Sequence, residues 1–363
     1  MSNTFGQHIK VTIFGESHGN GIGCIIDGLP AGISIDWEAL KREMARRAPG
    51  NSNLATPRKE KDAFEVLSGY FNDHTTGTPL AMEIRNTSQH SSDYDILKDN
   101  MRPGHADYTG RVKYGGFNDY RGGGHFSGRI TAPLTFAGAI AEQVLQAKGI
   151  TIGSHVVRIG NHTDRGFHPL GEAAETLEAL KQQKLPVLTE SIGQQMEETI
   201  LDAKQEGDSV GGVVECMAIG LPVGLGDPFF DSLESTLSHM MFSIPAVKGI
   251  EFGDGFAMAG MKGSKANDPM AYTDGKPSVL TNHNGGILGG ISNGNPLLFR
   301  VAIKPTASIG KEQHTINIST GKDTLLSIGG RHDPCIVPRA IPVIETATAL
   351  VLLDALLGLE KSR

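Results

Sequence analysis

The sequence has few cysteines, few aromatic residues and no excess of positive charge. Its three cysteines, Cys24, Cys216 and Cys335, are widely spaced in 363 residues and form no C-x-x-C pair, which argues against a zinc site and favours a reducing compartment. Aromatic residues make up 6%, and 33 lysines and arginines against 40 aspartates and glutamates give a net charge of −7. This balance argues against general binding to nucleic acids or anionic membranes, so we expect small-molecule partners.

Long uninterrupted apolar runs are also missing. The first seven residues are polar, so we find no secretory signal there and expect a cytoplasmic protein. The most apolar stretch, residues 340–357, contains Glu345 and Asp354, which predicts a buried core helix and argues against a membrane span.

The common nucleotide-binding loops are absent from the sequence. Gly19, Gly21 and Gly23 resemble the start of G-x-G-x-x-G, but Cys24 or Ile26 takes the place of the last glycine. No G-x-x-x-x-G-K-[ST] loop is present either. Any phosphate is therefore expected to be bound by side chains and irregular backbone.

Glycine, in contrast, is abundant, with 47 residues, nearly twice the usual share of about 7%. The glycines have no fixed period, so we interpret them as turns and as loops that approach a ligand closely. Four of these loops carry a histidine: His18 in GESHG, His105 in RPGHAD, His125 in RGGGHFSGR and His332 in GGRHDPC. Imidazole suits proton transfer near neutral pH, although for any one of them alone a structural role is the simpler interpretation.

Arginines accompany these histidines in the same segments. Guanidinium groups bind phosphates and carboxylates through two parallel hydrogen bonds. Arginines beside these histidines therefore predict an anionic, multiply charged ligand. A basic site with histidines and no metal-ligand pattern suits elimination or transfer of phosphate. The arginines concerned are Arg102, Arg121, Arg129, Arg331 and Arg339.

The apolar pattern favours α+β layers in a single domain, 1–363, over a doubly wound parallel sheet, because the strands do not alternate regularly with the helices. A polar surface insertion is expected at about 161–208, and 86–127 is expected to be one long irregular stretch. Strands are predicted over 8–14 and 21–27, which together resemble a hairpin, and over 64–70, 80–85, 210–219 and 297–303. Helices are predicted over 36–47, with Asp36 as the N-cap, and over 128–148, 172–184, 192–205, 233–241 and 339–357. Residues 48–62 are predicted to be a mobile loop, with solvated charges at 58–62.

Nine segments in this order resemble the chorismate synthases over essentially the whole chain: FGESHG, RRAPG, RPGHADYT, DYRGGG, SGR-x-TA, SIPAVKGIEFG, GGILGGISNG, KPTAS and GRHDPC. The resemblance implies core helices sandwiched between two antiparallel β-sheets, and a homotetramer. It also implies a carbon–oxygen lyase that performs a 1,4-anti elimination of phosphate from 5-enolpyruvylshikimate 3-phosphate, giving chorismate, the last common step of the shikimate pathway. Reduced FMN is required and not consumed, with NADPH as a possible source of reducing equivalents. The alternative is an FMN-dependent oxidoreductase that uses NADPH.

The resemblance also implies roles for individual residues. His18 would protonate the departing phosphate, His105 would protonate or steady the reduced flavin, and Asp333 would help to remove the ring proton. The implied flavin contacts are His125, Phe126, Ser127, Gly289, Lys304, Pro305, Thr306, Ala307, Ser308 and Arg331. The implied substrate contacts are Arg47, Arg129 and Arg339, with Arg47 also a contact for NADPH.

The chain departs from the family pattern at a few of these places. Many members have Arg-Ser where this chain has His125-Phe126, arginine where it has Ala48, and asparagine where it has Pro245. A second arginine implied to contact NADPH is replaced by Asn53.

The arginines near the implied site are expected to repel one another when no ligand is bound. Residues 48–62 and 101–127 have little apolar burial, so we expect both segments to be mobile without ligand and to become ordered when anions bind. The arginines in this expectation are Arg46, Arg47, Arg102, Arg121, Arg129, Arg331 and Arg339.

Overall fold

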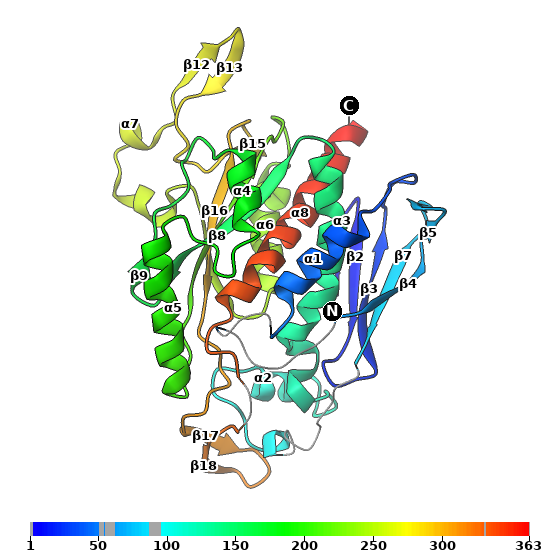
Figure 1. Cartoon of the computed structure of the whole chain (residues 1–363), viewed down its shortest axis with the longest axis vertical. Coiled ribbons are helices and arrows are strands. Elements are labelled where there is room, and N and C mark those ends of the chain that lie inside the picture. Colours follow the sequence, from blue (N-terminus) through cyan, green and yellow to red (C-terminus); the bar gives the residue numbers. More distant parts are fainter. Residues whose placement is uncertain (1–2, 51–53, 55–61, 87–95, 330–331, 363) are drawn as a thin grey trace.

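A computed structural model describes residues 3–50, 54, 62–86, 96–329 and 332–362. Two five-stranded sheets, antiparallel throughout, enclose a layer of helices (Figure 1). The first sheet has the order β1-β2-β3-β7-β4, with strands Thr4–Phe5, Lys10–Gly15, Gly21–Asp27, Leu80–Arg85 and Phe64–Ser68. The second has the order β11-β16-β10-β8-β9, with strands Val247–Phe252, Leu297–Ile303, Gly212–Ile219, Thr151–Ile159 and His162–Thr163. The predicted α+β sandwich is confirmed.

Four helices fill the space between the sheets: α1 (Trp37–Arg47), α3 (Thr131–Gln146), α6 (Leu233–Ser243) and α8 (Val337–Ser362). Asp36 begins α1 as predicted, because its Oδ1 accepts hydrogen bonds of 2.9 Å from the amides of Glu38 and Ala39. Helices α3 and α8 pack closely, and a Cβ at Gly138 would lie 2.2 Å from the carbonyl oxygen of Thr346. This contact requires glycine.

Helix α8 accounts for the most apolar stretch of the sequence. Within the described part of the chain it alone is long and apolar enough to cross a membrane. Most of it is buried between the sheets, as Figure 1 shows by its central position. The predicted core helix is therefore confirmed, and it runs from Val337 to Ser362 instead of ending at Leu357.

Several elements differ from the sequence prediction. The main strands β8 and β11 were not predicted, and helix α2 (Asp107–Lys113) lies inside the stretch expected to be irregular. The segment expected as a surface insertion contributes apolar side chains to the core, because Leu177 and Leu180 pack against Met217 of the second sheet. Its helices are α4 (Ala174–Leu180) and α5 (Glu190–Gln205).

Small ribbons complete the described fold. They are β5–β6 (Tyr70–Phe71 and His74–Thr75), β12–β13 (Met270–Thr273 and Lys276–Val279), β14–β15 (Ile287–Leu288 and Ile291–Ser292) and β17–β18 (Gln313–Asn317 and Lys322–Leu326), with the short helix α7 (Gly263–Ala266). Ribbons β12–β13 and β17–β18 project from opposite ends of the sandwich in Figure 1.

Candidate active site

A cavity of about 800 Å³ brings together most of the residues predicted from the sequence. Loops from both halves of the chain line it, together with the ends of α1, α3 and α8. The predicted residues on its wall are His18, His105, His125, His332, Phe126, Ser127, Lys304, Pro305, Thr306, Ala307, Ser308, Arg47, Arg102, Arg129, Asp333 and Arg339.

Two predicted flavin contacts are not brought to this cavity within the described chain. Gly289 lies in the turn between β14 and β15 and does not line the cavity, and Arg331 lies outside the described residues. Two basic lining residues, His239 and Lys248, were not selected from the sequence. Lys248 belongs to the family segment SIPAVKGIEFG, and its place in that segment is the sequence signal by which it could have been selected.

The glycine run Gly122–Gly124 holds the two predicted catalytic histidines. All three glycines have positive φ, between +54° and +88°, within a short 3₁₀ segment. A Cβ on Gly122 would lie 2.1 Å from Cε1 and Nδ1 of His18, and a Cβ on Gly123 would lie 3.1 Å from Cε1 of His105. The bare backbone therefore packs directly against both imidazole rings.

His18 is buried and oriented by its neighbour Ser17. The Ser17 hydroxyl donates toward the carbonyl oxygens of Gly122, at 3.1 Å, and Arg121, at 3.3 Å. Since its one hydrogen is used there, Ser17 Oγ accepts from Nδ1 of His18, 3.1 Å away. His18 is 3% exposed, so the contact with Ser17 Oγ fixes the orientation of its imidazole ring.

We expect Gly122→Ala to lower turnover about tenfold or more, because its methyl group would displace the His18 ring from its position. Gly115→Ala is the matched control, since φ is +61° there against +57° at Gly122, and the nearest atom to its Cβ is 3.8 Å away. Both variants should lose about 1–2 kcal/mol of stability from backbone strain. Equal turnover in the two variants would contradict the packing role of Gly122.

A buried carboxylate joins two of the predicted substrate arginines. Asp62 Oδ2 lies 2.7 Å from Nη2 of Arg47, and Asp62 Oδ1 lies 3.0 Å from Nη1 of Arg129. Burial lowers the pKa of Arg47, as do the nearby Arg339 and Arg129, while Asp62 opposes the shift. The side chain of Asp62 is 2% exposed, so the prediction of a solvated charge at this position is wrong.

The expected repulsion among the arginines is present at Arg47, whose pKa Arg339 and Arg129 lower, but a carboxylate partner offsets it at each described arginine of the larger cavity and its loops. The partners are Asp62 for Arg47 and Arg129, Asp107 for Arg102, Asp119 for Arg121, and Asp333 for Arg339. Most of the predicted mobile loop 48–62 lies outside the described residues. In the other segment, 101–127, helix α2 and these ion pairs provide order.

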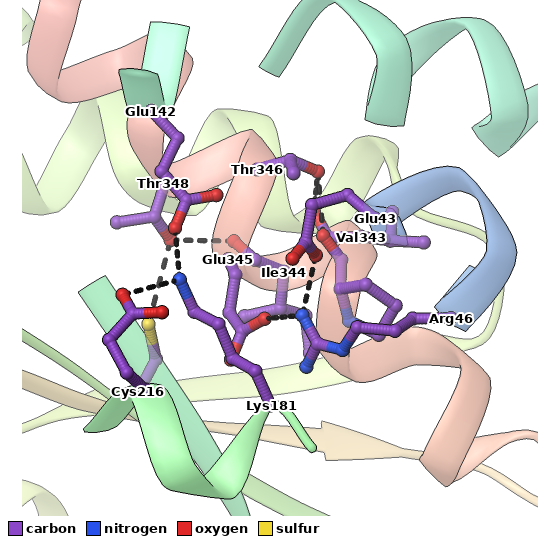
Figure 2. Close-up of polar contacts among 12 residues, drawn as sticks. Glu43, Arg46, Glu142, Lys181, Cys216, Val343, Ile344, Glu345, Thr346 and Thr348 are labelled. Atoms are coloured by element: carbon purple, nitrogen blue, oxygen red, sulfur yellow. Dashed lines mark hydrogen bonds and ion pairs between the residues drawn. The ribbon is translucent and has the colours of Figure 1, made fainter. Parts of the chain in front are cut away.

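Arg46 points into a different cavity, of about 460 Å³, on the other side of Arg339. There Arg46 contacts Glu43 and the fully buried Glu345, whose Oε2 lies 2.7 Å from Arg46 Nη1 (Figure 2). Lys181 binds Glu142 in the same cluster. Glu178 also lies 3.2 Å from Lys181 Nζ, so four carboxyl groups share the two cations. Burial raises the pKa of Glu142 to about 7; Glu43 and Glu345 add to the rise, and Lys181 opposes it.

This raised pKa predicts how stability depends on pH. The folded protein binds the Glu142 proton more tightly than the unfolded chain does. Protonated Glu142 therefore contributes to the free energy of unfolding in full below about pH 4.5, and this contribution is lost as pH rises through 7. Glu142→Gln keeps an acceptor for Lys181 and removes the titration. We expect urea unfolding to show a smaller fall in stability from pH 5 to 8 in the variant. Parallel curves for the two proteins would contradict the assignment.

The residues that depart from the family pattern lie in several places. His125, Phe126 and Pro245 line the larger cavity, and Ala48 lines the smaller one. His125 Nδ1 donates to the carbonyl oxygen of Gly15 at 2.8 Å, since only a donor suits that oxygen. Asn53 lies outside the described residues.

Comparison with known proteins identifies the family. The family model described as chorismate synthase matches residues 9–357. The chain belongs to the chorismate synthase family. Chorismate synthases of Dehalococcoides mccartyi and Chitinophaga pinensis are each 47% identical to it, over 98% and 99% of this chain and 96% and 98% of theirs. A crystal structure of chorismate synthase has a TM-score of 0.77 and 30% identity, covering 98% of this chain and 93% of that one. Membership supports a chorismate synthase function, with a small molecule as substrate.

Proposed function

We propose that this protein is a carbon–oxygen lyase that eliminates phosphate from 5-enolpyruvylshikimate 3-phosphate in a 1,4-anti sense, giving chorismate. One carbon–oxygen and one carbon–hydrogen bond break, a carbon–carbon double bond forms, and phosphate and a proton leave, so no electrons are gained or lost overall. The observation that carries the proposal is a single cavity in which histidines, a carboxylate and buried arginines face one another. This set can bind an anionic substrate and move protons beside it.

The residues of this site also fit reduced FMN as the required cofactor. The Thr306 hydroxyl is buried and has no hydrogen-bond partner among the described residues, so the predicted flavin segment offers a polar group to a ligand. Burial and the neighbouring Lys248 lower the pKa of Lys304, and an anion such as the FMN phosphate would relieve that repulsion. Lys304–Ser308 and His125–Ser127 would hold the cofactor, which when bound would supply transient electron density to the allylic carbon–oxygen bond.

The protein's own groups would divide the remaining work. Arg47, Arg129 and Arg339 would bind the carboxylates and phosphate and stabilise charge on the leaving group. His18 would give a proton to the departing phosphate, and His105 would hold or move a proton at the cofactor. Asp333, held by Arg339, is the carboxylate assigned to ring-proton removal.

The direct test is anaerobic incubation with chemically reduced FMN and the enolpyruvyl substrate, with phosphate release and diene absorbance recorded together. We expect both in equal amounts. Because the elimination is redox-neutral, NADPH added to a parallel incubation should not be oxidised in proportion to product. One NADPH oxidised for each product molecule would support the oxidoreductase alternative and contradict the proposal, as would absence of both products.

We also propose a cytoplasmic homotetramer. The three cysteines are buried and unpaired, which supports a reducing compartment such as the cytoplasm.

The exposed aromatic side chains support the tetramer. Phe229, Phe230 and Phe256 are each more than 80% accessible, as expected of a surface that another subunit covers.

A further inference from the structure

Asp107, the first residue of α2, connects Arg102 to His105. Its Oδ1 lies 2.5 Å from Nδ1 of His105 and accepts from Nη2 of Arg102 at 2.8 Å. Its Oδ2 accepts from Nε of Arg102 at 2.7 Å and from the Arg102 amide at 3.1 Å. The arginine is fixed in turn, since its Nη1 donates to Ser308 Oγ at 3.1 Å. The carboxylate is therefore held by several hydrogen bonds while it contacts the histidine.

These contacts determine which nitrogen of His105 carries hydrogen. Burial opposes the charge on Asp107, but hydrogen bonds from Arg102 and His105 outweigh burial and hold the pKa of Asp107 well below its usual range. An ionised carboxylate only accepts, so Nδ1 must be the donor in the 2.5 Å contact. Arg102 Nη2 also lies 3.0 Å from Nδ1 and is only a donor, but one of its two hydrogens serves Asp107, and the shorter contact of Nδ1 to the carboxylate decides the direction.

The other ring nitrogen, Nε2, is left for the cavity. His105 lines the cavity with its side chain 19% exposed, and the bare backbone of Gly123 packs beside Nε2, where a Cβ would lie 3.2 Å away. Within the described part of the chain, Nε2 makes no hydrogen bond. The ring is thus held at one nitrogen and open at the other.

We propose that Asp107 is a positioning residue, which fixes His105 as the Nδ1–H tautomer so that His105 exchanges its proton with the site through Nε2. The inference rests on the proposed function, because the proton exchange belongs to the elimination. The tautomer itself is a property of the empty protein and can be tested separately.

An amide in place of the carboxylate would reverse the arrangement. In Asp107→Asn the amide oxygen is expected at the Oδ2 position, where Arg102 directs two donors, its Nε and its amide, against the single Arg102 donor Nη2 at the Oδ1 position. This orientation places the NH₂ group against His105 Nδ1. Nδ1 would then accept, and the hydrogen would move to Nε2. In Ser-His-Asp triads the same exchange costs about 10⁴-fold in turnover because it selects the wrong tautomer.

The first experiment measures the tautomer by ¹⁵N NMR of histidine-labelled protein, with the His105 signals assigned by their loss in His105→Gln. We expect Nδ1–H in the parent protein and in Asp107→Glu, and Nε2–H in Asp107→Asn. Finding Nε2–H in the parent would overturn the proposal even if no variant folded. An unchanged tautomer in folded Asp107→Asn would overturn it too.

The second experiment separates positioning from stability by measuring kcat and KM under anaerobic conditions. Asp107→Asn should lower kcat about 10²-fold or more with KM changed less than about threefold, and Asp107→Glu should recover at least about tenfold of that loss. Asp254→Asn is the control, because Asp254 contacts His283 Nδ1 at 2.6 Å and neither residue lines the cavity. A kcat within about twofold of the parent in Asp107→Asn would overturn the proposal.

The two proposals fail in different ways. If the parent protein releases no phosphate and forms no diene, the proposed function is wrong, while the tautomer measurement still decides the role of Asp107. If the parent is active and the tautomer is unaffected by Asp107→Asn, the positioning role alone is wrong.

Discussion

His18→Ala and His105→Ala are each expected to lower turnover about 10²- to 10⁴-fold, because this is the usual contribution of a general acid or base. Both rings line the same cavity and pack against the glycine run between them. Neither belongs to the apolar core, so the variants should fold. The measurement is turnover at saturating reduced FMN under anaerobic conditions, beside a melting curve for each variant.

His314→Ala is a suitable control, since His314 is exposed on β17 and does not line the cavity. Its turnover should equal that of the parent protein. Parental turnover in either cavity variant would refute the catalytic assignment of that histidine. A collapsed melting curve would show instead that the ring is needed for folding.

Local sequence signals predicted the parts of the fold that depend on local chemistry. The Asp36 cap, the hairpin of β2 and β3 and the apolar helix α8 were visible because capping and periodicity act over a few residues. Strand β8 was not visible because Gly153, Ser154 and His155 stand in the middle of a strand that is buried on both faces, which removes the alternation.

Helix α2 was missed for a different reason. It has only seven residues, and Gly110 in its interior weakens any helical pattern. The glycine is explained by tertiary packing, because a Cβ there would lie 2.7 Å from the ring of Phe126. A contact between residues this far apart in sequence cannot be derived from the local pattern.

The site shows the same division. Histidines and arginines in glycine-bordered loops could be selected by residue type, and the cavity brings most of them together. Their carboxylate partners could not, because Asp62 and Asp107 look like ordinary surface acids in the sequence. Only the fold shows that each lies against a buried arginine, at Arg47 and Arg102.

The importance of Asp62 can be measured directly. Asp62→Asn keeps the size of the side chain but removes the charge shared by Arg47 and Arg129, of which Arg47 is 2% and Arg129 11% exposed. Removing one partner of a buried ion pair leaves an uncompensated charge, so we expect a loss of about 3–5 kcal/mol in the free energy of unfolding. Urea unfolding of the parent protein and the variant gives this difference.

Inorganic phosphate should reverse part of this loss, because an added anion can take the place of the missing carboxylate between the two guanidinium groups. The midpoint of unfolding should therefore rise more with phosphate in Asp62→Asn than in the parent protein, where Asp62 already occupies the arginines. Asp27→Asn, an exposed aspartate at the end of β3, should change stability by less than about 0.5 kcal/mol and show no added response to phosphate. If Asp62→Asn behaved like Asp27→Asn, the arginines would not depend on Asp62, and its buried position would have no role in holding the empty site together.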